Sequence, residues 1–195
     1  MSRYTYNQNY VQKINLTIRK SLLAYNRVTA IRVDLRFPSS NIIYLDDSAV
    51  ITRFFESLKA KINADLKRKS KAWKRNLSCS LFYVWVREFG RIKNRKHYHV
   101  LLLLNKDVYK GLGNFEKTEG TLYALIQQAW CSAIGVDYPT DRYSVQIPDN
   151  PVIWLNSNDI YNDNTIFELS QRCNYLAKEH TKYYDDGERS FGCSR

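Results

Sequence analysis

The sequence contains few cysteines and no long apolar run, and both absences narrow the class of protein. Only four of its 195 residues are cysteines, and no two of them form a CxxC pair. We therefore expect neither a disulfide framework nor a zinc knuckle, but free thiols in a reducing compartment. Apolar runs such as residues 100–104 are far shorter than the roughly 20 residues that a membrane helix needs.

The N-terminal residues, MSRYTYNQNY, also lack the apolar segment of a signal peptide. We therefore expect a cytoplasmic protein with no membrane partner. The sequence shows no internal repeat and no helicase segment, and its length suits one domain with a sizeable core. Residues 1–26 are polar and rich in Asn and Tyr, so we expect an N-terminal arm, with a short helix at 10–25, before a single domain over residues 27–195.

Acidic residues are scarce relative to basic ones. Thirty Lys and Arg stand against 19 Asp and Glu, which gives a formal net charge of +11. Such a surplus favours a polyanionic partner, usually nucleic acid, although a run of cations is also an ordinary solvated surface. The basic residues that we expect to bind nucleic acid are Lys67, Arg68, Lys71, Lys74, Arg75, Arg91, Lys93, Arg95 and Lys96.

The order of the expected elements indicates an α+β fold. Dense β-branched and aromatic residues predict strands at residues 27–38, 77–90, 96–106 and 141–156. Apolar residues at helical spacing predict helices at residues 49–76, 121–135 and 167–184. The two middle strands read as an antiparallel hairpin, and the fourth, interrupted by two prolines, reads as an edge. The order β-α-β-β-α-β-α resembles a ferredoxin-like, RRM-like antiparallel sheet with helices packed on one face, followed by a short polar tail.

Two of the three histidines lie at the entrance of the strand at residues 96–106. His97 and His99 point to the same face because strand side chains alternate, while Tyr98 points into the packing. Glu88, on the preceding strand of the hairpin, is expected about opposite the pair. A carboxylate with two imidazoles suits Mg²⁺ or Mn²⁺, and zinc less specifically. Asp34 is an alternative acidic ligand, and two histidines that merely touch phosphate or solvent are the simpler interpretation.

A tyrosine and a lysine lie three residues apart in the last expected helix. Tyr175 and Lys178 would therefore share one helix face. A phenol with a pKa near 10 is a weak nucleophile, but a nearby ammonium and a metal-bound phosphate favour the phenolate. Such a tyrosine could attack a DNA phosphorus and form a phosphotyrosine. Because the chain has 15 tyrosines, this spacing alone is weak; Tyr183 and Tyr184 could assist.

Taken together, these features resemble an HUH endonuclease, named for its histidine–hydrophobic–histidine strand. The segments RVDLRFP, KHYHVLLLLN and NYLAKEHTK look like the inovirus replication-initiator family, which is similar to the filamentous phage gene-two protein. The resemblance implies that Glu88, His97 and His99 hold Mg²⁺ or Mn²⁺. It further implies that Tyr175 is the nucleophile that frees a 3′-OH, and that Lys178 stabilises the developing charge or positions the metal-bound phosphate.

The implied function is metal-dependent nicking and rejoining of single-stranded or hairpin origin DNA, which initiates rolling-circle replication of a phage or related element. Unwinding and synthesis would then need a host helicase and polymerase. One alternative is a transposase of the same superfamily. Another is a non-catalytic, RRM-like nucleic-acid-binding module, although the aromatic residues that such a module carries on its central strand are replaced here by histidines.

Overall fold

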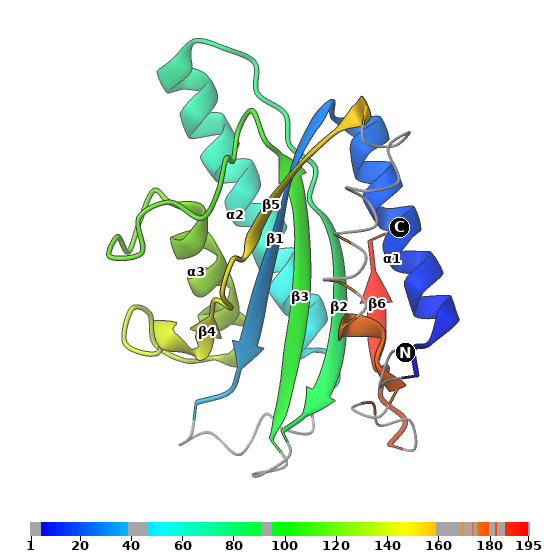
Figure 1. Cartoon of the computed structure of the whole chain (residues 1–195). Coiled ribbons are helices and arrows are strands. Elements are labelled where there is room, and N and C mark those ends of the chain that lie inside the picture. Colours follow the sequence, from blue (N-terminus) through cyan, green and yellow to red (C-terminus); the bar gives the residue numbers. More distant parts are fainter. Residues whose placement is uncertain are drawn as a thin grey trace.

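The computed structural model describes residues 5–38, 47–90, 95–158, 169, 173, 175–179, 182 and 186–194. Within them the chain forms a six-stranded antiparallel sheet and three α-helices, an α+β fold (Figure 1). The helices are α1 (Gln8–Ala24), α2 (Val50–Trp73) and α3 (Leu122–Ile134). The strands are β1 (Arg27–Arg36), β2 (Phe82–Phe89), β3 (Lys96–Asn105), β4 (Val145–Gln146), β5 (Val152–Asn156) and β6 (Phe191–Cys193). No helix among these residues is long and apolar enough to cross a membrane.

The sheet is built around β3, the strand that carries the two histidines. The strand order is β4-β1-β3-β2-β6, and β5 also pairs with β1. Helix α2 connects β1 to β2, and α3 connects β3 to β4, which is a split βαβ arrangement. The predicted hairpin is confirmed by the antiparallel pairing of β2 with β3. The segment predicted as an edge strand, residues 141–156, does lie at an edge of the sheet. It forms two short strands, β4 and β5, and both pair with β1.

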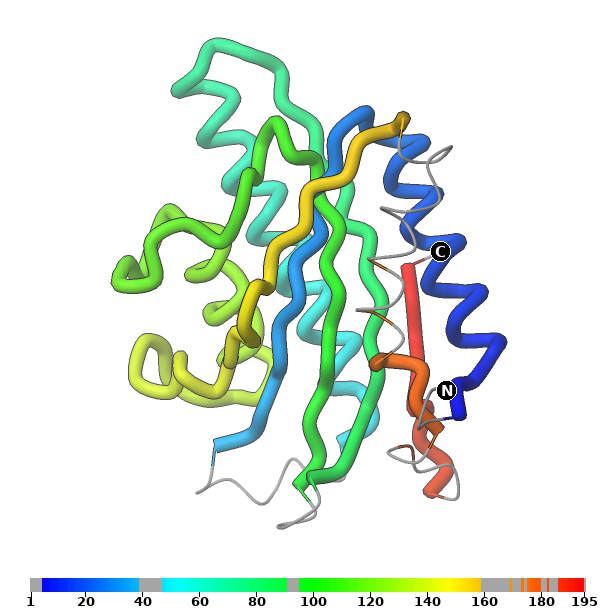
Figure 2. The backbone as a smooth tube through the Cα atoms, in the orientation of Figure 1, coloured from blue at the N-terminus to red at the C-terminus, as the bar shows by residue number. Residues whose placement is uncertain are grey.

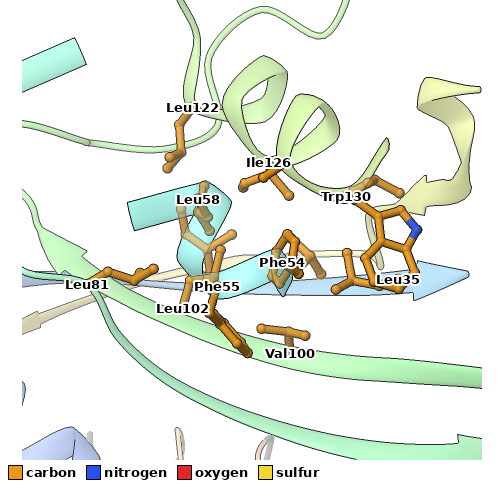
Figure 3. Packing of buried hydrophobic residues seen from close by; sticks show 14 of the residues in the cluster. Leu35, Phe54, Phe55, Leu58, Leu81, Val100, Leu102, Leu122, Ile126 and Trp130 are labelled. Atoms are coloured by element: carbon orange, nitrogen blue, oxygen red, sulfur yellow. The ribbon is translucent and has the colours of Figure 1, made fainter. Parts of the chain in front are cut away.

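The main hydrophobic core lies between the sheet and helices α2 and α3. The predicted stripe of α2 is buried there, with Val50, Phe54, Leu58, Ile62 and Leu66 spaced four apart. Figure 3 shows Phe54, Leu58 and Trp130 packed over Val100 and Leu102 of β3. Trp130 is fully buried, and its indole N–H donates to the Arg36 carbonyl, which ties α3 to the end of β1.

Helix α1 covers the opposite face of the sheet, and this corrects two sequence-based predictions. Ile14, Ile18 and Leu22, four residues apart, pack with Val84 and Leu101 of the sheet in a second core. Residues 8–24 are therefore a layer of the fold, not a polar arm, and the sheet has helices on both faces. The apolar stripe of α1 is narrow and its flanks are polar, so its average composition hides it.

The C-terminal residues complete the second edge of the sheet. The sequence predicts a polar tail, but β6 pairs with β2 there. A Cβ at Gly192 would lie 2.5 Å from the Trp85 ring, so a glycine permits this close pairing. Of the helix expected at residues 167–184, the structure describes Leu169, Cys173, Lys182 and residues 175–179, of which Tyr175–Ala177 form a 3₁₀ turn.

Candidate metal centre

Strand register brings four polar side chains to one face of the sheet. His99 on β3 is paired with Asp34 on β1, and His97 is paired with Glu88 on β2. Because paired residues share a face, all four project on the side covered by α1. Tyr98 points the other way and is buried in the main core, as the strand alternation predicts.

The donor atoms of Glu88, His97 and His99 converge on one small volume. The Nε2 atoms of His97 and His99 lie 3.2 Å apart, and Glu88 Oε2 lies 3.5 Å from His99 Nε2. All three donors fall within 4.8 Å of one another. Neighbouring ligands of a six-coordinate ion at about 2.1 Å are about 3 Å apart, so this donor set fits one divalent cation.

The other nitrogen of each imidazole contacts an oxygen acceptor. His99 Nδ1 lies 2.6 Å from Asp34 Oδ1, and His97 Nδ1 lies 3.2 Å from the Arg95 carbonyl. When both imidazoles are neutral, these contacts favour the proton on Nδ1, which leaves both Nε2 lone pairs directed at the shared volume. Asp34 therefore contacts the side of the His99 ring that faces away from the shared volume, whereas Glu88 is one of the converging donors.

Burial and ion pairs set the charges in this cluster. Burial alone would raise the pKa of Glu88, but its hydrogen bond with His99 and the charge of Lys182 lower it to about 2. Burial lowers the pKa of His97, which favours the neutral form that binds metal. Burial would also lower the pKa of His99, but its hydrogen bonds to Asp34 and Glu88 outweigh that effect and raise it.

Lys182 is a member of the cluster that sequence reasoning missed. Its ammonium is fully buried and forms an ion pair with Glu88 Oε1. Burial lowers the pKa of Lys182 despite the charge of Glu88. Its only sequence signal was its place at the end of NYLAKEHTK, because a lysine in a polar segment gives no hint of burial.

Tyr175 lies beside the same histidine. Its hydroxyl is 3.3 Å from His99 Nε2, and its ring meets the imidazole edge-on at 5.0 Å between centroids. Lys178 Nζ lies 4.6 Å from the centre of the Tyr175 ring. Burial, followed by the charges of Glu88 and Asp34, raises the pKa of Tyr175, while Arg32 and Arg36 oppose that rise.

The segment that carries Tyr175 is held by residues just before α1. Tyr6 and Lys178 form an antiparallel bridge, and the Asn7 N–H donates to the Ala177 carbonyl at 2.8 Å. The side chain of Asn7 in turn caps α1 by accepting from the Tyr10 N–H. In Figure 2 the orange segment near residue 175 and the blue helix α1 lie on the same side of β2. The N-terminal residues therefore position the tyrosine.

The predicted nucleic-acid-binding cations do not form one surface. Lys96 is 1% exposed and pairs with Glu188, so its prediction as a DNA contact is corrected: strand alternation turns it away from His97. Arg95 is half-buried beside the histidines. Arg91 and Lys93 lie outside the described residues, as do Tyr183 and Tyr184.

The predicted nucleic-acid-binding residues in the second half of α2 and just after it lie away from the histidines. Lys67, Lys71, Lys74 and Arg75 are exposed, and Arg68 pairs with Asp65. This half of α2 packs on the main-core face, where Asp65 accepts from the Tyr109 hydroxyl just after β3. The histidines occupy the start of β3 on the other face. Figure 2 shows the two regions at opposite ends of the molecule.

Comparisons with known proteins identify a matching family model and two relatives from Escherichia coli. A family model described as the YagK/YfjJ C-terminal domain matches residues 1–194. The chain is 36% identical over 196 residues to "Uncharacterized protein YfjJ" of Escherichia coli (strain K12), covering 95% of this chain and 93% of that protein. It is 35% identical over 193 residues to "Uncharacterized protein YagK" of the same strain, covering 95% and 92%. No solved structure matches significantly.

Proposed function

The chain belongs to the YagK/YfjJ C-terminal domain family, and we propose that it is an HUH-type endonuclease. It nicks and rejoins single-stranded DNA with Tyr175 as the nucleophile and Mg²⁺ or Mn²⁺ held by Glu88, His97 and His99. The observation that carries this proposal is the 3.3 Å between the Tyr175 hydroxyl and His99 Nε2, the atom where the other donors converge. These groups come from two distant parts of the sequence, the β2–β3 hairpin and the segment that contains Tyr175.

The architecture supports the same proposal. The β-α-β-β-α-β core, with the histidine strand in the middle of the sheet, is the arrangement expected for an HUH nuclease. The non-catalytic RRM-like alternative needs an open sheet face for bases to stack on. Here α1 covers one face and α2 and α3 cover the other, so that alternative has less support.

The proposed step is a transesterification. A divalent cation at the site supplies charge neutralisation and orientation of the scissile phosphate. The Tyr175 oxygen forms a bond to phosphorus while the bond from phosphorus to O3′ breaks. The phenolic proton leaves to solvent, and the departing O3′ takes up a proton to become a 3′-OH. Lys178, next to the tyrosine ring, offsets the negative charge that develops.

Rejoining reverses these bonds, because the phosphotyrosine conserves the energy of the phosphodiester. A 3′-OH attacks the phosphotyrosine, and the tyrosine leaves as a phenol. We propose that this reaction initiates rolling-circle replication of a phage or related element at single-stranded or hairpin origin DNA, with a host helicase and polymerase. A transposase would use the same chemistry on the end of a mobile element.

An adduct assay with matched tyrosine variants tests the proposal. The purified protein is incubated with a labelled library of random single-stranded oligonucleotides and Mn²⁺, and denaturing gels detect covalent protein–DNA adducts. We expect adducts with the wild type and with Tyr143→Phe, whose ring is 70% exposed and outside the site. We expect none with Tyr175→Phe, with His97→Ala or in EDTA.

Mass spectrometry of the trapped peptide identifies the modified residue. A phosphotyrosine on a residue other than Tyr175 would reject the nucleophile assignment. If the protein binds the library equally with and without EDTA and forms no adduct with Mg²⁺ or Mn²⁺, the protein is a non-catalytic binding module. The sequences recovered from adducts would show whether the DNA resembles an origin or a mobile-element end.

A further inference from the structure

The face of β1 that looks toward the proposed site carries three charged residues in alternation. Arg32, Asp34 and Arg36 alternate with the buried Val33 and Leu35. In the sheet register, Arg36 lies opposite His97, Asp34 opposite His99, and Arg32 opposite Leu101. Two guanidinium groups therefore flank the Asp34–His99 pair, one on each side along the strand.

These two arginines differ from the other arginines of the same sheet. Arg27 of β1 pairs with Asp107, and Arg87 of β2 pairs with Asp186 and Glu188. Among the residues that the structure describes, no carboxylate forms an ion pair with Arg32 or Arg36. The carboxylate between them, Asp34, is engaged by His99 at 2.6 Å.

The surroundings of each arginine are suited to an anion. Arg32 is half-buried, and its guanidinium carbon lies 5.7 Å from the centre of the Tyr175 ring. Leaving a cation partly desolvated without a counter-ion is costly, so a bound anion would stabilise it. Arg36 is exposed at the strand end, next to the histidine pair. A guanidinium binds phosphate with two parallel hydrogen bonds, which fixes its orientation as well as its distance.

We infer that Arg32 and Arg36 form a two-point clamp that holds the phosphates of a DNA single strand along β1. Four residues of a strand span about 13–14 Å, so the two side chains would hold different phosphates. The proposed scissile phosphate lies between them, at the level of His99. This part of the inference rests on the proposed nuclease function, whereas phosphate binding by the two arginines does not.

The clamp also explains how the nucleophile finds one phosphodiester bond. A metal ion can bind any phosphate, so it does not by itself select a register. Two fixed contacts, one on each side, set which phosphate faces the Tyr175 hydroxyl. Arg32 remains beside the tyrosine ring after cleavage, where it can hold the phosphotyrosine until rejoining.

Salt-dependent binding without cleavage tests the clamp. A fluorescent oligothymidine of about 30 nucleotides is titrated with protein in EDTA at several salt concentrations. Each lost phosphate contact should reduce the slope of log K against log salt by about 0.7. We expect a loss of about 0.7 for Arg36→Gln and about 1.4 for Arg32→Gln combined with Arg36→Gln. Lys110→Gln combined with Lys117→Gln removes the same charge from exposed loop positions and should leave the slope unchanged.

The outcomes separate the clamp from the nuclease proposal. An unchanged slope in the double arginine variant would overturn the clamp, even if the wild type forms adducts at Tyr175. A reduced slope in a protein that never forms adducts would support the clamp and reject the nuclease. Because Arg36 is exposed, Arg36→Gln is expected to fold. If Arg32→Gln does not fold, the slope measured for Arg36→Gln alone still decides whether Arg36 contacts a phosphate.

Discussion

At the scale of single residues, the candidate site depends on side chains that orient other side chains. Asp34 contacts the far nitrogen of His99, and Lys182 holds one oxygen of Glu88 while the other faces the histidines. The sequence favoured Glu88 as the acidic ligand, because it is expected opposite the histidines, and kept Asp34 as an alternative. Their different roles follow from which atom of each histidine they reach, and that depends on strand register.

We expect Asp34→Asn to lower the affinity for Mn²⁺ by about 10–100-fold, because an amide orients the imidazole less strongly than a carboxylate. Isothermal titration with Mn²⁺ at neutral pH measures this directly. Asp107→Asn is the matched control, since Asp107 pairs with Arg27 at an exposed position. Equal affinity in Asp34→Asn and the wild type would show that Asp34 does not orient the ligand.

At the scale of elements, α1 links the stability of the fold to the position of Tyr175, the proposed nucleophile. Its buried side packs on β2 and β3, and the residues before it hold the Tyr175 segment through backbone hydrogen bonds. Helices α2 and α3 were predictable because their apolar residues recur at helical spacing. The packing of α1 was not predictable. Its apolar stripe is narrow and its mean composition is polar, so its sequence resembles that of a helix exposed on the surface.

Two adjacent leucines in α1 provide a matched test of this packing. Leu22 is 2% exposed, whereas Leu23 is 81% exposed. We expect Leu22→Ala to reduce the free energy of unfolding by about 2–5 kcal/mol, and Leu23→Ala to change it by no more than about 0.5 kcal/mol. Urea denaturation followed by circular dichroism measures both. Equal effects of the two substitutions would mean that α1 does not pack on the sheet in solution.

At the scale of the whole molecule, a strongly basic chain contains local acidic groups that stabilise the fold. The net charge is +11, yet Glu88, Asp186 and Glu188 pair with the buried cations Lys182, Arg87 and Lys96. Basic composition predicted a nucleic-acid partner, but it could not show which cations are already neutralised. Lys96 illustrates this, because its neighbours in sequence gave no sign of the distant Glu188.

These ion pairs predict a loss of stability in acid. The pKa of Glu88 falls from an ordinary 4.5 to about 2, and the pKa of Asp186, bonded to Arg87, falls from 3.8 to about 2. Between these limits the unfolded state binds more protons than the folded state, so stability decreases as the pH falls from about 4.5 toward 2. We expect the Tm in EDTA to fall over this range and to fall less steeply in Asp186→Asn. A Tm that stays constant down to pH 2 would contradict the prediction.

The sequence by itself determined what depends on local periodicity. Strand alternation put His97 and His99 on one face, and helical spacing defined the buried side of α2. Only the tertiary structure decided which distant groups meet: Asp34 with His99, Lys182 with Glu88, and Tyr175 with the histidine pair. The reason is physical, because a local pattern fixes the direction of a side chain, whereas its partner depends on strand register and on packing between segments far apart in the chain.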